Sequence, residues 1–174
     1  LIGSDTFFTQ ENTYPIAQNN LEKLKTTLLC DSRSYISVDT YYDEIGNLSA
    51  FENAVHAAFS DAKEQDISLL YFSTHGYLGE NESSAGLYLS DGMEENLLFA
   101  QDLHRITSSI PGKKIILKGN HDYWWSTAAK FYKFCEENGF ENLYVLNNNS
   151  YEYENWSICG TRGWFFEEVR STAH

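Results

Sequence analysis

The fold is decided by one stretch, residues 66–76, which reads DISLLYFSTHG. Residues 67–73 form an apolar run that is too short for a helix, so we predict a buried central strand there. His75 and Gly76 follow directly, and glycine permits a tight turn that leaves the imidazole accessible. Functional residues gather at the carboxyl ends of parallel strands, so His75 is a candidate general base. The alternative is a capping histidine that bonds the loop backbone.

Outward from this strand, short apolar runs alternate with amphipathic segments. Asn19 and Asn20 are expected to cap a helix whose leucines at 21, 24, 28 and 29 share one face. Residues 49–52, SAFE, match a capping box before a second helix. Two further helices are expected over residues 99–109 and 127–138, the latter ended by Gly139. Strands are expected over residues 1–3, 35–40, 113–117 and 143–146, with a small excursion from the sheet around 87–89. Residues 152–156 and 157–159 are expected to form a strand edge or a hairpin.

This alternation predicts the fold class. Buried strands joined by helices imply βαβ units, so we expect a three-layer α/β sandwich with a mostly parallel sheet and helices on both faces. Asp5, His75 and the set Asn120-His121-Asp122 each follow an apolar strand. If the strands are parallel neighbours, all of these residues lie at the same edge of the sheet.

Composition restricts the functional class. The chain has 174 residues, and 42% of them are apolar, so it is expected to fold. Its net charge is −13, and this negative charge is expected to disfavour binding to nucleic acid or a membrane surface. Cys30, Cys135 and Cys159 are too scattered for a disulfide framework or a structural zinc site, which favours a reducing, cytoplasmic location. The sequence holds no apolar run long enough to span a bilayer. Both ends read as cut.

The first part of the chain resembles the caspase-like and clostripain-like cysteine peptidases. The resemblance covers residues 1–117 and rests on the phrase around His75 and on the order of the elements before it. It implies a caspase-like fold, with His75 as the catalytic histidine and a peptide as substrate. In that family the next strand ends in a cysteine nucleophile, but here His121 holds the place of that cysteine. A cysteine peptidase needs a thiolate within hydrogen-bond reach of its histidine. Since no cysteine holds the position of the nucleophile, we expect His75 to lack its catalytic partner.

The second part begins with a strand–loop–helix phrase, residues 118–126, which reads KGNHDYWWS. Asparagine offers a neutral oxygen to a metal, histidine can donate a proton to a leaving alkoxide, and aspartate can orient that histidine. The alternative is a polar turn, for which Gly-Asn is ordinary chemistry.

Together with LNNN at 146–149 and ICGTRGW at 158–164, this phrase closely resembles the calcineurin-like metallophosphoesterases over residues 111–174. The resemblance implies that Asn120 is a metal ligand, that His121 contacts the phosphate, and that Asp122 stands behind it. The implied cofactor is a divalent metal such as Mn, Zn or Fe, and the substrate is a phosphoester small molecule. The family's Asp-x-His and Gly-Asp phrases are absent before residue 119, so one matched ligand stands where a two-metal site needs about six.

The two resemblances meet in the strand at residues 113–117. We therefore expect a caspase-like portion over 1–117 and a metallophosphoesterase-like portion over 118–174 that completes or extends the same sheet. The leading interpretation is a hydrolase-derived chain without a complete catalytic set.

Two alternatives remain. His75 and His121, with Asn120 or Asp5, could bind zinc or nickel if they end neighbouring strands. A non-catalytic binding module, with tryptophans at 124, 125 and 164 on its surface, is the third possibility.

Overall fold

A computed structural model describes residues 1–8, 15–30, 37–63, 66–79, 85–117 and 127–160. It is a mixed α/β structure with small sheets, some of them parallel. The chain divides into two compact units, Leu1–Pro111 (unit 1) and Gly112–His174 (unit 2).

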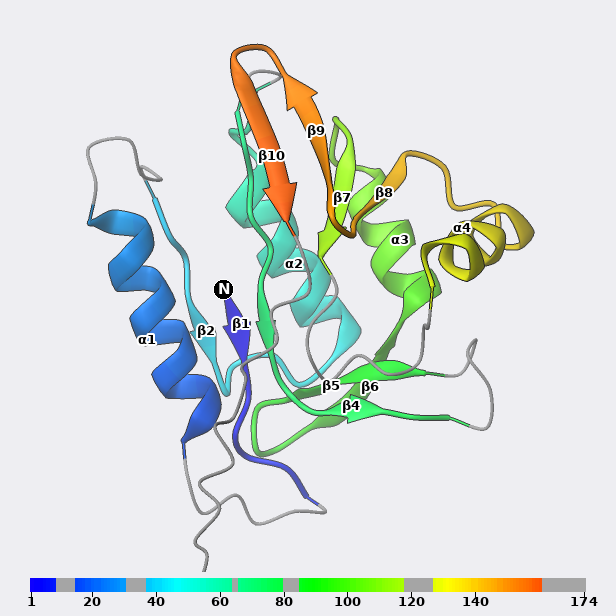
Figure 1. Ribbon diagram of the computed structural model, residues 1–174. Helices are drawn as coiled ribbons and strands as arrows, with labels where there is room; N and C mark the ends of the chain where they lie inside the picture. Colours follow the sequence, from blue (N-terminus) through cyan, green and yellow to red (C-terminus); the bar gives the residue numbers. More distant parts are fainter. Residues whose placement is uncertain (9–14, 31–36, 64–65, 80–84, 118–126, 161–174) are drawn as a thin grey trace, which may run out of the picture. The chain divides into compact units, whose positions relative to one another are not determined.

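A three-stranded parallel sheet forms the centre of unit 1 (Figure 1). Strand β1 (Ile2–Gly3) lies between β2 (Tyr41–Tyr42) and β3 (Phe72–Ser73), so the strand order is β2-β1-β3. Ile2 pairs with Phe72, and Gly3 pairs with Ser73. This register places the segments after β1 and β3 at the same edge of the sheet.

Helices cover the two faces of this sheet, as β1 shows. The side chain of Ile2 packs in one core with Phe51 and Val55 of α2 (Leu48–Phe59). Gly3 points the other way, toward α1 (Ile16–Leu29), and a Cβ there would lie 2.8 Å from Leu21 Cδ1. Because consecutive residues of a strand face opposite sides, α1 and α2 lie on opposite faces of β1.

A second, antiparallel sheet follows β3 and extends unit 1. It has the order β4-β5-β6, formed by β4 (Gly76–Tyr77), β5 (Gly86–Ser90) and β6 (Glu95–Phe99). Leu89 and Leu98 face the core and are almost fully buried, as is Ile106 of α3 (Ala100–Ser108). The expected excursion around residues 87–89 is therefore a complete three-stranded sheet.

Unit 2 contains a parallel strand pair and a hairpin (Figure 1). Strand β7 (Lys114–Leu117) pairs in parallel with β8 (Leu143–Leu146), and helix α4 (Ala128–Glu137) lies between them in sequence. Phe131, Cys135 and Val145 form its small core. Strands β9 (Asn149–Tyr153) and β10 (Trp156–Gly160) form an antiparallel hairpin, one of the two arrangements expected for residues 152–159, although the strands begin and end at other residues than expected.

Most expected elements are present, and the helix over 127–138 ends as predicted, with Gly139 at φ +68°. The starts of α1 and α2 were misjudged: α1 is capped by Asp5, which is distant in sequence, whereas the cap of α2 directly precedes that helix. Helix α1 begins at Ile16, so Asn19 and Asn20 lie inside it and do not cap it. Helix α2 is capped by Asn47, whose side chain accepts a hydrogen bond from Ala50 N, so residues 49–52 are not its capping box.

Two strand expectations were also wrong in extent. Only Phe72 and Ser73 of the stretch 67–73 pair with a strand, and Ile67 and Leu69 are each 40% exposed. In the described sheet β1, not β3, is the central strand. The strand expected over 35–40 falls instead at Tyr41–Tyr42, and residues 35 and 36 lie outside the described residues. Leu29 is 47% exposed and does not share the buried face of Leu21.

Candidate functional site

The candidate site is the carboxyl edge of the parallel sheet in unit 1, where Asp5 and His75 follow adjacent strands. Each residue lies two positions beyond the matched pair Gly3 and Ser73. The sequence predicted that Asp5, His75 and residues 120–122 lie at one edge of the sheet, and the structure places Asp5 and His75 there. Asn120, His121 and Asp122 lie outside the described residues, so their position relative to His75 stays a prediction.

The backbone around His75 is held by β5. Thr74 Oγ1 donates a hydrogen bond to Tyr88 O at 2.7 Å, and Tyr88 N donates one to His75 O at 2.9 Å. The imidazole packs on Phe7, with ring centroids 4.7 Å apart and the planes tilted by 59°. Phe7 is buried whereas His75 is exposed, so the ring of His75 rests on the protein and faces solvent.

Asp5 caps helix α1 from outside the helix. Its two carboxylate oxygens accept hydrogen bonds from Ala17 N and Gln18 N, both at 3.0 Å. These N–H groups belong to the first turn of the helix, where they have no acceptor within the helix. The negative charge of Asp5 also interacts favourably with the positive end of the helix dipole. Asp5 therefore positions α1 against the sheet.

The loop after β1 is fixed by Asp43, which directly follows β2. Its carboxylate accepts hydrogen bonds from Asp5 N at 2.9 Å, from Thr6 N at 3.2 Å and from Thr6 Oγ1 at 2.9 Å. Asp43 has φ +50°, a left-handed conformation that aspartate tolerates better than most residues. This arrangement could not be predicted from the sequence, because Asp43 lies 38 positions after Asp5 and 37 positions after Thr6.

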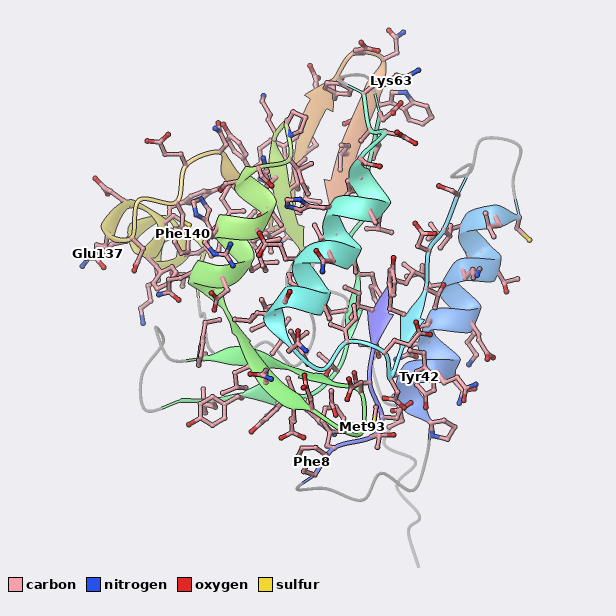
Figure 2. The ribbon with its side chains drawn as sticks, turned by 180° about the vertical axis from the view of Figure 1, so that it is seen from behind. Phe8, Tyr42, Lys63, Met93, Glu137 and Phe140 are labelled. Atoms are coloured by element: carbon pink, nitrogen blue, oxygen red, sulfur yellow. The ribbon has the colours of Figure 1, made fainter. Side chains whose placement is uncertain are left out.

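Tyr42 lies between these two carboxylates. Its hydroxyl is hydrogen-bonded to the side chains of Asp5 and Asp43. Loss of hydration, followed by the negative charges of Asp43 and Asp5, raises the pKa of Tyr42 to about 12. The phenol therefore stays protonated at neutral pH, and its single O–H can donate to one of the two carboxylates at a time. Figure 2 shows Tyr42, Phe8 and Met93 at one end of unit 1 and Lys63 at the other.

A serine pair joins this edge to the antiparallel sheet. Ser4 Oγ donates to Ser90 O at 2.8 Å, and Ser90 Oγ donates to Thr6 O. Ser90 Oγ also accepts a hydrogen bond from Gly92 N at 3.3 Å. Both serines are buried and both side chains are hydrogen-bonded, so their role is to hold the two sheets together.

Of the three cysteines, Cys30 lies in the same unit as His75, and Cys135 and Cys159 lie in unit 2. Cys30 ends α1, and the start of α1 is held at the site edge by Asp5. A helix of 14 residues is roughly 20 Å long, so Cys30 lies about that far from the edge. Cys135 is buried in the core of unit 2, and burial raises the pKa of its thiol. Cys159 is an exposed residue of β10 in unit 2.

In unit 2, the parallel pairing of Leu117 with Leu146 brings the ends of β7 and β8 together. Asn149 Oδ1 accepts a hydrogen bond from Asn147 N at 2.7 Å, and Asn149 Nδ2 donates to Val145 O at 3.1 Å. These asparagines hold the turn into the hairpin. Across the described ranges no three His, Cys, Asp or Glu side chains are grouped so as to hold a metal ion. The described residues by themselves do not fit a two-metal centre.

Comparison with protein-family models, with curated proteins and with solved structures gave no match to this chain. In the part of the chain that the structure describes, no helix combines the length and the apolar character needed to cross a membrane.

Proposed function

We propose that this chain is of hydrolase lineage, with a caspase-like portion that keeps its histidine, His75, but does not act as a cysteine peptidase. The three-layer sandwich is part of this proposal, and the helices on opposite faces of β1 support it. The absence of peptidase activity is inferred from the position of Cys30, which lies roughly 20 Å from the edge of the sheet that bears His75. Catalysis by a Cys–His pair needs the two side chains within hydrogen-bond reach.

Alkylation kinetics test this proposal. A cysteine with a pKa near 8.5 is about 3% thiolate at pH 7, whereas pairing with an imidazolium makes it largely thiolate, a gain of roughly 30-fold. We expect iodoacetamide to label each cysteine at the same rate, within twofold, in the native chain and in His75→Ala. The matched control is His56→Ala, which removes an exposed histidine from the last turn of α2. A tenfold loss of labelling at one cysteine, in His75→Ala alone, would overturn the proposal.

A metal-dependent phosphoesterase that uses Asn120 and His121 is a second candidate. The observation that favours it is the parallel pairing of β7 with β8 around α4, because residues 118–126 then follow the carboxyl end of β7. Residues at that end of a parallel pair are well placed for a ligand. A bound divalent ion would supply charge stabilisation for a phosphoryl group, and His121 would donate a proton to the leaving oxygen.

Hydrolysis of bis(p-nitrophenyl) phosphate tests the second candidate. The chain is stripped with a chelator and reloaded with Mn²⁺ or Zn²⁺, and bound metal is measured by mass spectrometry. This candidate requires turnover that depends on metal and falls at least 100-fold in His121→Ala, with His104→Ala as the matched control. Turnover unchanged in His121→Ala, or no metal bound at equimolar loading, would eliminate it.

A further inference from the structure

The acidity of this chain is confined to one unit. Unit 1 contains 17 Asp and Glu against five Lys and Arg, a net charge of −12, whereas unit 2 is nearly neutral at −1. Of the described cations in unit 1, Arg105 is paired with Glu52. A surface with this excess of negative charge attracts cationic partners and repels anionic ones.

A cleft of about 460 Å³ lies along β6 in unit 1. It is a shallow depression that is open to solvent. Its apolar wall consists of Leu48, Tyr88, Leu97 and Phe99. Its acidic groups are Glu95 and Asp102. The combination of an apolar wall and carboxylates suits a ligand with an apolar body and a positive charge.

The two carboxylates can still bind a cation. Asp102 is half-buried in the first turn of α3, and within the described ranges it meets no cation and no hydrogen-bond donor. Glu95 Oε2 accepts a hydrogen bond from Phe8 N at 2.9 Å. A carboxylate has room for further donors after one hydrogen bond, so Glu95 retains acceptor capacity.

The strand that lines the cleft has one open edge. β6 is the outer strand of the order β4-β5-β6, and no described strand pairs with its far side. An unpaired edge presents backbone N–H and C=O groups that an extended peptide can use. Glu95, Leu97 and Phe99 share one face of β6, because side chains alternate along a strand. A peptide added to β6 with alternating side chains would place apolar groups beside Leu97 and Phe99 and a cation beside Glu95.

We propose that the β6 cleft binds an extended peptide segment that carries lysine or arginine, which adds to the edge of β6 as a fourth strand. Backbone hydrogen bonds to β6 supply part of the affinity. The apolar wall and the carboxylates of Asp102 and Glu95 select alternating apolar and basic side chains. This binding is independent of the hydrolase lineage proposed above, because the cleft includes neither His75 nor any residue of unit 2.

Fluorescence anisotropy with a labelled, acetylated heptapeptide of alternating lysine and valine tests the proposal. We expect binding to weaken at least fivefold in Asp102→Asn. The matched control is Asp61→Asn, which removes an exposed charge beyond the far end of α2 and should change affinity less than 1.5-fold. Glu95→Gln keeps an acceptor for Phe8 N and should also weaken binding, so a folding defect in Asp102→Asn alone cannot decide the result.

Two altered peptides complete the test. An alternating glutamate and valine peptide should not bind, because it meets carboxylates of the same charge. A lysine and valine peptide methylated at alternate backbone nitrogens should lose at least fivefold in affinity if it pairs with β6. Equal binding by Asp102→Asn and Asp61→Asn, equal binding of the acidic peptide, or no binding of the basic peptide would overturn the proposal.

Discussion

Replacement of Asp5 by alanine should release the start of α1. The two hydrogen bonds from Ala17 N and Gln18 N, each 3.0 Å long, lose their acceptor, and the helix loses the negative charge at its N-terminus. Loss of a capping side chain costs about 1 kcal/mol, and loss of the charge near the helix dipole costs about 0.5 kcal/mol. We therefore expect Asp5→Ala to destabilise α1 by roughly 1.5 kcal/mol. Asp5→Asn keeps one acceptor oxygen and should cost about half as much.

Hydrogen exchange measured by NMR is the suitable assay, because the chain has two compact units and a single unfolding curve would mix them. A loss of about 1.5 kcal/mol speeds exchange of the amides of α1 roughly 13-fold. Asp61→Ala, an exposed position without a capping role, serves as the control. If Asp5→Ala leaves the exchange of Ala17 and Gln18 within twofold of the native chain, Asp5 does not position α1 and this part of the account is refuted.

Three further predictions concern stability and titration. Phe51→Ala should destabilise unit 1 by about 3–5 kcal/mol, because Phe51 is fully buried at the centre of its core; hydrogen exchange of the α2 amides that reports a loss below about 1 kcal/mol would contradict this. Tyr42 should titrate near pH 12 by absorbance at 295 nm. Since its pKa is raised on folding, its contribution to stability is complete below about pH 10 and is lost between about pH 10 and 12, a dependence that Tyr42→Phe should remove. Gly139→Ala should destabilise α4 by about 1 kcal/mol, because Gly139 has φ +68°; unchanged hydrogen exchange of the α4 amides would count against a glycine-dependent helix end.

The sequence was sufficient for the local elements of this fold. Periodicity identified the cores of helices α1 to α4 in the described part of the chain, and the short apolar runs identified β7 and β8. It failed at the start of α1, because the cap of this helix is an aspartate 12 positions before Ala17. It also overestimated β3, since five of the seven apolar-rich positions at 67–73 do not pair with a strand. Pairing depends on the partner strand, and β1 has only two residues.

The candidate site was predictable only in part. The position of His75 after a strand, and of Asp5 after its neighbour, followed from the pattern of apolar runs. The roles of Asp43 and Tyr42 could not be predicted, because each acts through contacts with residues far away in sequence. The use of Asp5 as a helix cap was also hidden, since nothing local marks it as different from a site carboxylate.

The pH dependence of alkylation of each cysteine, followed by mass spectrometry, tests the central claim most directly. If no cysteine is a partner of His75, the pH profile of alkylation of each cysteine should be the same in the native chain and in His75→Ala. Cys135 should react only at higher pH than an ordinary thiol, because burial raises the pKa of its thiol. A cysteine that is half-reactive below about pH 7, and loses this property in His75→Ala, would contradict the account and indicate a working Cys–His pair.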